Sequence, residues 1–276
     1  MKAAILQLSV SDDPVINLPT TLTFVRDAVE MGAEFVLTPE VTNCISTSRA
    51  QQNKVLCHEE NDPSLIGLCQ IASELKIHLL IGSLALKTHD PDGRFANRSF
   101  LIDPDGEILA RYDKIHMFDV AISETETWFE SEGYRPGNKA VLAKTNFASI
   151  GMAVCYDMRF PRLADALVNA GAQILTFPAA FSPETGAAHW HSLLRARAIE
   201  AGAWVLAPAQ TGTHQGVSEK KRSTYGHSLV ISPWGEVILD AGIEAGAYLF
   251  DLDLDKVSEA RRRVPSRENA RDFEGP

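Results

Sequence analysis

Two stretches of the sequence share a pattern that restricts the fold more than any other feature of the chain. Residues 100–109 and residues 229–238 each consist of an apolar run, a Pro-x-Gly turn and a second apolar run. Because proline presets one turn position and glycine tolerates a positive φ, each stretch predicts an antiparallel hairpin. Hairpins in both halves of the chain argue against a purely parallel, doubly wound sheet. They predict two related half-sheets that pack together.

The rest of the chain alternates between strand and helix patterns. Strand-length apolar runs occur at residues 3–10, 35–37 and 79–86, and apolar residues recur with helical spacing at 18–31 and 64–75. This alternation predicts helices on the faces of the sheets. Because no stretch resembles an interdomain linker, we expect one domain over residues 1–276, with 264–276 as a polar C-terminal tail. The Glu-rich segment 120–138 is expected to be a long ordered loop.

Composition excludes several classes of protein. With 45% hydrophobic and 22% charged residues, the chain is not disordered, collagen-like or a coiled coil. Its net charge of −10 argues against a general affinity for nucleic acid or anionic membranes. No apolar run approaches the roughly 18 residues that span a bilayer, and the first residues fit a strand better than a secretion signal. We therefore expect a cytoplasmic protein with neither nucleic acid nor membrane partners.

One cysteine has an informative position. Cys44, Cys57, Cys69 and Cys155 show no disulfide or metal spacing, so reduced thiols are expected. An apolar strand runs into Cys155, and Pro161 then begins a helical pattern. A strand-to-helix turn presents a side chain at a sheet edge, where backbone N–H groups and the helix dipole favour a thiolate nucleophile. The position also suits a small buried hydrophobe, the usual role of a free cysteine.

Two charged residues also end apolar runs. Glu40 ends the run that begins at Phe35, and Lys114 follows the run that begins at Ile108. Strand ends converge on the rim of a sheet, where sites for small molecules are commonly built. Each residue taken alone fits a solvated charge at the end of a strand equally well.

Together, these residues form a recognisable series. The segments 38–40 (Thr-Pro-Glu), 112–116 (Tyr-Asp-Lys-Ile-His) and 154–161 (Val-Cys-Tyr-Asp-Met-Arg-Phe-Pro) occur in this order. The chain thereby resembles the nitrilase superfamily of carbon–nitrogen hydrolases, from about Lys2 to about Asp255. Further segments that match are 128–131, 135–137, 178–181, 185–191, 193–200 and 225–228. The resemblance implies a four-layer α-β-β-α sandwich of two mixed β-sheets.

The resemblance also implies roles for individual residues. Cys155 matches the nucleophile, Glu40 the general base, and Lys114 the cation that stabilises the tetrahedral oxyanion. Glu130 matches a second glutamate that orients the lysine and the attacking water. The backbone N–H of Tyr156 would complete the oxyanion hole. A thioester on Cys155 and release of ammonia follow from these roles, and neither a cofactor nor a metal is implied.

The substrate is less closely defined. The chain is most similar to the branch that contains ω-amidase and deaminated-glutathione amidase, in which the residue matching Arg159 binds a substrate carboxylate. An ion pair of Arg159 with Asp157 or Glu130 is the alternative. Phe181 and Thr185 match residues of the same pocket. The implied substrate is a small carboxylate-bearing amide, either deaminated glutathione or an α-keto acid ω-amide such as α-ketoglutaramate.

Other interpretations remain open at this point. A nitrilase or an N-carbamoyl amide hydrolase would use the same chemistry, and segment 118–130 lacks a Pro-Gly that many relatives have. A catalytically silent binding protein and a redox-sensing thiol protein are rivals from other classes. The resemblance further implies a homodimer, packed through helices near residues 160–170 and 193–201, with the C-terminal tail reaching the partner.

The remaining charged clusters are given structural interpretations. His189 and His191 stand two residues apart on a predicted helix and therefore point to different faces, so they are interpreted as structural rather than as metal ligands. The basic runs 220–222 and 261–263 are expected to be solvated surface charge.

Overall fold

Two six-stranded sheets form the centre of the molecule. The computed structural model describes residues 1–123, 126–217 and 221–275. The first sheet consists, in spatial order, of β16 (Gly246–Asp251), β1 (Lys2–Gln7), β2 (Phe35–Leu37), β3 (His78–Leu86), β4 (Ala96–Ile102) and β5 (Ile108–Asp113). The second consists of β15 (Val237–Asp240), β14 (Leu229–Ile231), β11 (Trp204–Ala207), β10 (Ile174–Thr176), β9 (Ser149–Met152) and β8 (Val141–Lys144).

The two sheets repeat one pairing pattern, and both are mixed. In the first sheet, β1, β2 and β3 are parallel neighbours, flanked by antiparallel β16 on one side and the hairpin β4–β5 on the other. In the second, β9, β10 and β11 are parallel, flanked by antiparallel β8 and the hairpin β14–β15. Both hairpins predicted from the Pro-x-Gly turns are therefore confirmed, and they occupy equivalent positions in the two sheets.

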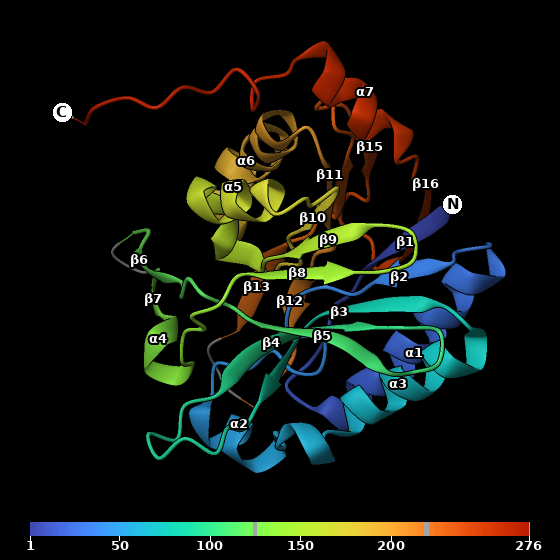
Figure 1. Cartoon of the computed structure of the whole chain (residues 1–276). Helices are drawn as coiled ribbons and strands as arrows, with labels where there is room; N and C mark the ends of the chain where they lie inside the picture. Colours follow the sequence, from blue (N-terminus) through green and yellow to red (C-terminus); the bar gives the residue numbers. More distant parts are fainter. Residues whose placement is uncertain (124–125, 218–220, 276) are drawn as a thin grey trace.

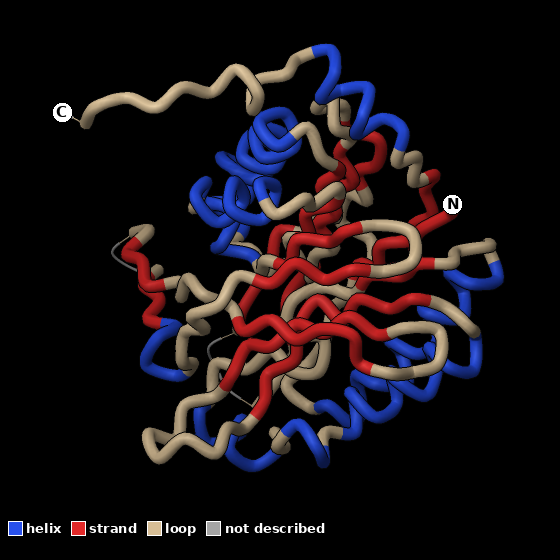
Figure 2. Tube along the Cα trace, in the orientation of Figure 1, coloured by secondary structure: helices blue, strands red, loops and turns tan. Residues whose placement is uncertain are grey.

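Helices cover the outer face of each sheet (Figures 1 and 2). Helices α1 (Pro14–Glu30) and α3 (Pro63–Leu75) lie on the first sheet, and α5 (Pro161–Asn169) and α6 (Pro183–Ala201) lie on the second. Side chains alternate along β1 because successive strand residues face opposite sides. Ala3 and Ile5 join the core shared with the second sheet, whereas Ala4 and Leu6 join the core under α1 and α3.

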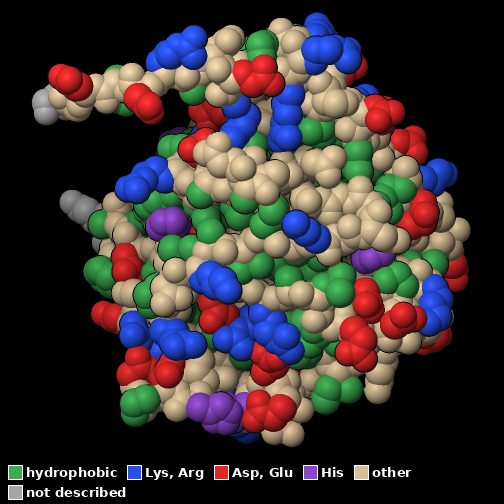
Figure 3. Space-filling model, in the orientation of Figure 1, with side chains coloured by type: hydrophobic (Ala, Val, Ile, Leu, Met, Phe, Trp, Pro, Cys, Tyr) green, Lys and Arg blue, Asp and Glu red, His purple; other side chains and the backbone are tan. Residues whose placement is uncertain are grey.

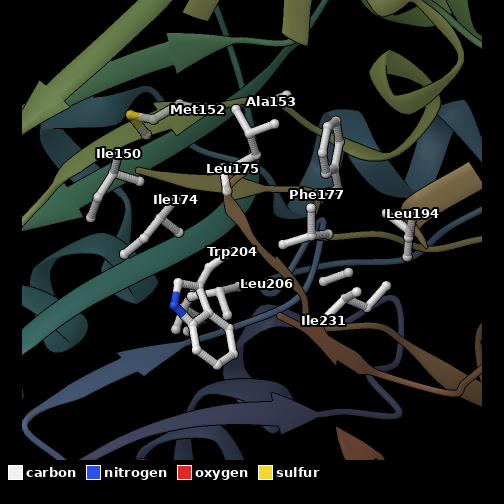
Figure 4. Close-up of a cluster of buried hydrophobic side chains, with 14 of the residues drawn as sticks. Ile150, Met152, Ala153, Ile174, Leu175, Phe177, Leu194, Trp204, Leu206 and Ile231 are labelled. Carbon is white, nitrogen blue, oxygen red and sulfur yellow. The ribbon is translucent and has the colours of Figure 1, made fainter. Parts of the chain in front are cut away.

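These layers confirm the predicted α-β-β-α sandwich. Figure 4 shows part of the larger core, where side chains of β9, β10 and β11, among them Ile150, Ile174 and Trp204, pack near Leu194 of α6. The central strands β2, β3, β10 and β11 are buried along their whole length, and hydrophobic burial of this kind is the main driving force for folding. The residues that follow these strands are therefore attached directly to the buried centre of the molecule.

The segment 120–138 differs from the expected long loop. It contains the short hairpin of β6 (Asp119–Ala121) and β7 (Thr127–Phe129), followed by the helical turn α4 (Glu130–Gly133). Its aromatic and β-branched residues favour a strand, and the Ile122 N–H donates to the Glu126 carbonyl to close the hairpin. The glutamates obscured this pattern in the sequence. Residues 124 and 125 lie outside the described residues.

The other elements join these layers or extend from them. They are α2 (Arg49–Val55), the 3₁₀ turns η1 (Glu59–Asn61) and η2 (Cys155–Arg159), the hairpin β12 (Thr211–His214)–β13 (Arg222–Tyr225), and α7 (Asp255–Arg263). After α7 the chain makes a turn at residues 266–269, passes over α6 and then projects away from the body of the molecule, up to residue 275 (Figure 1). On the face in Figure 3, acidic and basic side chains are interspersed. Within the described part of the chain, no helix is both long and apolar enough to cross a bilayer.

Candidate active site

Three strand ends bring the predicted site residues to one rim of the sandwich. Glu40 lies three residues after β2, Lys114 directly follows β5, and Cys155 lies three residues after β9. All three line the same cavity. The prediction that these strand ends converge is therefore confirmed.

Cys155 occupies a sharp turn between strand and helix. Its φ is +49°, a left-handed conformation that is rare for a residue with a side chain. Strained conformations of this kind cost roughly 1–3 kcal/mol and persist where the surroundings enforce them. The Cys155 N–H donates to the Pro178 carbonyl (2.9 Å), and Asp157 accepts from the Val154 N–H (2.8 Å). The predicted strand-to-helix turn is thus present and fixed on both sides of the thiol.

The buried Asp157 carboxylate connects this turn to the segment that carries Lys114. It accepts hydrogen bonds from the Tyr112 hydroxyl (2.7 Å) and from the His116 backbone N–H (3.1 Å), and the His116 ring lies 2.7 Å away. Tyr112 and His116 flank Lys114 in the sequence. One carboxylate therefore fixes the thiol turn relative to the lysine.

A buried ammonium lies between two carboxylates. Lys114 Nζ is 2.9 Å from Glu40 Oε1 and 2.8 Å from Glu130 Oε2, and the lysine is only 2% exposed. Asn97 Nδ2 donates to Glu40 (2.9 Å) and to Glu130 (3.3 Å). The Ala180 N–H donates to the second oxygen of Glu40 (2.8 Å). Both glutamates are thus held by several donors at once, and neither can rotate freely.

The backbone beside Glu40 depends on a glycine in the neighbouring strand. Gly82 of β3 lies so close that a Cβ added there would be 2.1 Å from the Thr38 carbonyl oxygen and 2.4 Å from that of Pro39. Val41, the residue after Glu40, has a φ of +47°. The loop that carries Glu40 therefore requires the close approach of its backbone to Gly82 and a strained conformation at Val41.

The charged groups of this cluster shift one another's pKa values. Burial alone would raise the pKa of Glu40, but the Lys114 ammonium and the Arg222 guanidinium outweigh it and lower that pKa. Burial alone would lower the pKa of Lys114, but Glu130 and Glu40 outweigh it and raise that pKa. Both groups are therefore charged at neutral pH.

The pKa of the Cys155 thiol differs from the prediction. Burial, followed by the negative charge of Glu40, raises the pKa of Cys155 well above its ordinary value, although Lys114 opposes this effect. The prediction that the turn and helix dipole favour a resting thiolate is therefore wrong, because dehydration and a neighbouring carboxylate dominate. The thiol is protonated at rest, and Glu40 is the adjacent group that can accept its proton.

The cavity has a volume of about 370 Å³, which suits a small molecule. Its walls combine the charged cluster with aromatic side chains. They include Glu40, Asn97, Lys114, Phe118, Trp128, Glu130, Cys155, Phe181, Arg49 and Arg222. Of the predicted site residues, the structure thus brings together Glu40, Lys114, Glu130, Cys155 and Phe181.

The other three predicted residues do not line the cavity. Arg159 lies against the Phe181 ring, 5.6 Å from its centroid, and against the ring of Tyr156 at 5.9 Å. Its Nη2 is 3.1 Å from Nδ1 of His189. The alternative in which Arg159 pairs with Asp157 or Glu130 is wrong for the described residues, since those carboxylates bond to other partners. The hydroxyl of Thr185 is buried and has no hydrogen-bond partner among the described residues.

Sequence reasoning missed several polar residues of the cavity, among them Asn97 and Arg222. Asn97, within β4, carried no signal, because its amide becomes informative only beside Glu40 and Glu130. Arg222 was expected to be solvated surface charge, but its side chain lines the cavity and its Nη2 donates to the Ala180 carbonyl (2.7 Å). That expectation was wrong because β13 turns Arg222 inward. Lys220 lies outside the described residues.

The second basic run also differs in part from the expected surface charge. Arg261 is partly buried and donates to the carbonyl of Gly202 (3.1 Å), which caps the end of α6, and to that of Ala172 (2.6 Å), which follows α5. Carbonyls at a helix end lack partners within the helix, and a cation there is favourable. Arg261 is therefore a structural residue.

Among the described residues, two clusters outside the cavity have side chains that a metal ion could use. They are His58, Glu60 and His89, and His191, His227 and Asp240. In the second cluster Asp240 already lies within hydrogen-bond distance of both histidines. His191 has Asp240 as a hydrogen-bond partner, its structural interpretation stays a prediction, and neither cluster lines the cavity.

Known proteins share this architecture. The Carbon-nitrogen hydrolase family profile matches residues 2–262. The chain is 35% identical to a deaminated glutathione amidase of Synechocystis, with 96% of each chain covered, and 34% identical to human omega-amidase NIT2, with 96% of this chain and 92% of that one covered. The crystal structure of Saccharomyces cerevisiae Nit3, a nitrilase superfamily member, matches with a TM-score of 0.82 at 30% identity, over 96% of this chain and 94% of that one.

The sandwich and these relatives define a class of enzymes that hydrolyse carbon–nitrogen bonds. The chain belongs to the carbon–nitrogen hydrolase family of the nitrilase superfamily. It is a hydrolase that acts on amides.

Proposed function

We propose that this enzyme cleaves the terminal C–N amide bond of a small carboxylate-bearing substrate through a Cys155 thioester and releases ammonia. The main support for this proposal is that a thiol, a hydrogen-bonded carboxylate and a buried ammonium line one cavity. A nucleophile, a base and a cation for developing negative charge are what acyl transfer requires.

The first half of the reaction forms the thioester. Glu40 takes the proton from the Cys155 thiol as the sulfur attacks the amide carbonyl carbon. The carbonyl oxygen becomes an oxyanion, stabilised by Lys114 and the Tyr156 backbone N–H. Glu40 then gives the proton to the amide nitrogen, the C–N bond breaks, and ammonia leaves.

The second half restores the thiol. Glu40 takes a proton from a water molecule as the water oxygen attacks the thioester carbon. Lys114 again stabilises the oxyanion, the C–S bond breaks, and the sulfur regains a proton from Glu40. Glu130 keeps Lys114 oriented in both halves through its two short contacts with the ammonium (2.8 and 3.0 Å).

The substrates that we propose are deaminated glutathione or an α-keto acid ω-amide. The ω-amide releases ammonia, whereas in deaminated glutathione the protonated amine of the cysteinylglycine dipeptide leaves in its place. The names of two relatives support this choice, since one is a deaminated glutathione amidase and another an omega-amidase. Phe181 forms a wall of the cavity, Arg159 lies against the rings of Phe181 and Tyr156, and Thr185 follows Phe181 by four residues in the sequence. We assign these four residues to substrate binding, with Arg159 contacting a carboxylate and the partnerless hydroxyl of Thr185 offering a hydrogen bond.

A screen for released ammonia, or for the released dipeptide amine in the case of deaminated glutathione, tests the proposal. Wild type, C155A and C69A are each mixed with glutathione-derived amides, ω-amides, nitriles and N-carbamoyl compounds. We expect release only from amides, its loss in C155A, and wild-type rates in C69A, since Cys69 lies outside the cavity. Turnover of nitriles or N-carbamoyl compounds instead would replace the proposed substrate class, and undiminished turnover by C155A would refute the mechanism.

We further propose a homodimer in the cytoplasm, packed through α5 and α6. The exposed Ile199 of α6 supports the dimer. The free state of all four cysteines supports the cytoplasm as the compartment. Sedimentation of the wild type and of Ile199→Glu tests it, since a dimer through this face should dissociate in the variant.

A further inference from the structure

A group of polar side chains lies on the second sheet, outside the catalytic cavity. His191 belongs to α6, His227 lies two residues before β14, and Asp240 ends β15, the edge strand of that sheet. None of the three lines the cavity. Their side chains are between 26% and 36% exposed. Segments distant in the sequence thus bring two imidazoles and one carboxylate together where solvent can reach them.

Both imidazoles direct a nitrogen at the same carboxylate oxygen. Asp240 Oδ2 lies 3.0 Å from Nε2 of His191 and 3.2 Å from Nδ1 of His227. Ligand atoms around a tetrahedral zinc ion are roughly 3.3 Å apart, because each lies about 2.0–2.1 Å from the metal. Two of the three separations therefore already match. The third, between the two nitrogens, is at most 4.8 Å, which rotation of the partly exposed His191 ring can shorten.

The orientation of the rings distinguishes this cluster from the one that contains His58 and His89. The His191 and His227 rings are inclined at 68°, with centroids 5.6 Å apart. A coordinated imidazole has its centroid roughly 3.2 Å from zinc, so this separation corresponds to an N–Zn–N angle of roughly 120°, near the tetrahedral value. The rings of His58 and His89 are instead stacked at 4.3 Å and 5°. Parallel stacked rings do not direct their lone pairs at one ion.

The fold already fixes two of the three side chains. His227 has a left-handed φ of +53°. Its N–H donates to the Gly242 carbonyl (2.6 Å), its carbonyl accepts from the Trp190 indole (2.8 Å), and the Tyr225 ring stacks on its imidazole at 4.6 Å. The Gly242 N–H donates to Oδ1 of Asp240 (2.9 Å). Because these groups are held in place beforehand, binding an ion costs little further ordering.

The donor set suits one class of cation. Burial raises the pKa of Asp240, but hydrogen bonds from His191, from the Gly242 N–H and from His227 outweigh it and lower that pKa. Asp240 is therefore a carboxylate at neutral pH. Two imidazoles with one carboxylate favour zinc and neighbouring transition metals, whereas magnesium and calcium prefer oxygen ligands alone.

We propose that His191, His227 and Asp240 form a binding site for a divalent transition-metal ion of the zinc class, with water as the fourth ligand. Each imidazole binds through the nitrogen that faces Asp240 and carries its proton on the other nitrogen. The ion connects α6 to the hairpin β14–β15 and stabilises the fold. His189 takes no part, since it contacts Arg159 instead. The site goes beyond the proposed function, because no step of the reaction uses it.

Zn²⁺ and Co²⁺ are the probes that test this site. They are titrated into C155A, which lacks the cavity thiol, and into C155A combined with H191Q, H227N, D240N or H89Q. Asparagine is used at position 227 because it tolerates a left-handed backbone. His89 is the matched control, an exposed histidine of the other cluster. A colorimetric chelator measures Zn²⁺ affinity, and visible absorption reports the geometry around Co²⁺.

We expect the parent to bind one Zn²⁺ per chain, to give a tetrahedral Co²⁺ spectrum, and to unfold at a higher temperature with Zn²⁺ than without it. H191Q, H227N and D240N should each weaken Zn²⁺ binding at least about tenfold, and H89Q should match the parent. A parent that binds no Zn²⁺, or affinity unchanged in all three ligand variants, would overturn the assignment. So would weakening in H89Q alone, or a Co²⁺ spectrum with the charge-transfer band of a thiolate ligand. H191Q and D240N alter partly exposed side chains, so they decide the outcome even if H227N does not fold.

Discussion

Replacing Lys114 with methionine should destabilise the enzyme in a way that depends strongly on pH. The ammonium is buried and is the shared partner of Glu40 and Glu130, with contacts of 2.8 to 3.0 Å. Removing it leaves two carboxylates without their cation. Breaking a buried ion pair by removing one partner costs about 3–5 kcal/mol, so we expect a loss of that size in the free energy of unfolding at pH 7.5.

The sign of the pH dependence follows from Glu40. In the wild type its pKa is lowered, so its contribution to stability is present above the ordinary glutamate pKa and is lost as the pH falls. In K114M burial is no longer outweighed by the ammonium, and the pKa of Glu40 rises. The variant then gains stability as Glu40 becomes protonated. The stability difference between the two proteins should therefore narrow as the pH falls from 7.5 to 5.

Urea unfolding of wild type, K114M and K76M at pH 7.5, 6 and 5 measures this difference. Lys76 is the control, because it pairs with Asp105 on the surface, where ion pairs contribute little. A K114M protein no less stable than K76M at pH 7.5 would refute the buried-cluster reasoning. A stability difference that stays constant with pH would refute the assignment of charge to Glu40.

Three further outcomes are expected. Asp157→Ala should lower the free energy of unfolding, measured with urea, by about 1–3 kcal/mol for each buried donor that it leaves unpaired. It should also lower kcat in steady-state kinetics, and an unchanged kcat would contradict the role of Asp157 in fixing Cys155 relative to Lys114. Gly82→Ala should place a Cβ against the Thr38 carbonyl and reduce kcat more than binding of succinamate, and equal activity would contradict the need for this close approach. R222M should move the acid limb of the kcat/KM profile for a neutral amide to higher pH, since the loss of its charge raises the pKa of Glu40, and an unshifted or opposite limb would contradict this coupling.

The parts of the fold that were predictable follow local rules. The Pro-x-Gly turns indicated β4–β5 and β14–β15 because their geometry is set within a few residues. Glu40 and Cys155 were predictable as strand-end residues, each at the rim of its own sheet. That the two rims meet was not predictable locally, because β2 and β9 belong to different sheets and only the packing of the sheets brings them together. The four layers followed from the alternation of strands and helices together with the resemblance to a family.

The predictions that were wrong concern features that depend on contacts between residues distant in the sequence, which no local pattern encodes. Arg222 belongs to a run of basic residues, which is typical of a solvated surface, and only the pairing of β12 with β13 turns it toward the cavity. The raised pKa of the Cys155 thiol arises from burial and from Glu40, which is distant in the sequence. The hairpin β6–β7 was hidden because its glutamates suggested a solvated loop.

The most direct test of the central claim is to detect an acyl group on Cys155. Wild type and C69A are mixed with succinamate, quenched in acid within the first turnovers, and examined by intact-protein and peptide mass spectrometry. We expect a mass increase equal to the succinyl group, located on the peptide that contains Cys155 and converted to a hydroxamate by hydroxylamine. Ammonia release with no acyl group on Cys155, or with only oxidised forms of that thiol, would contradict the account.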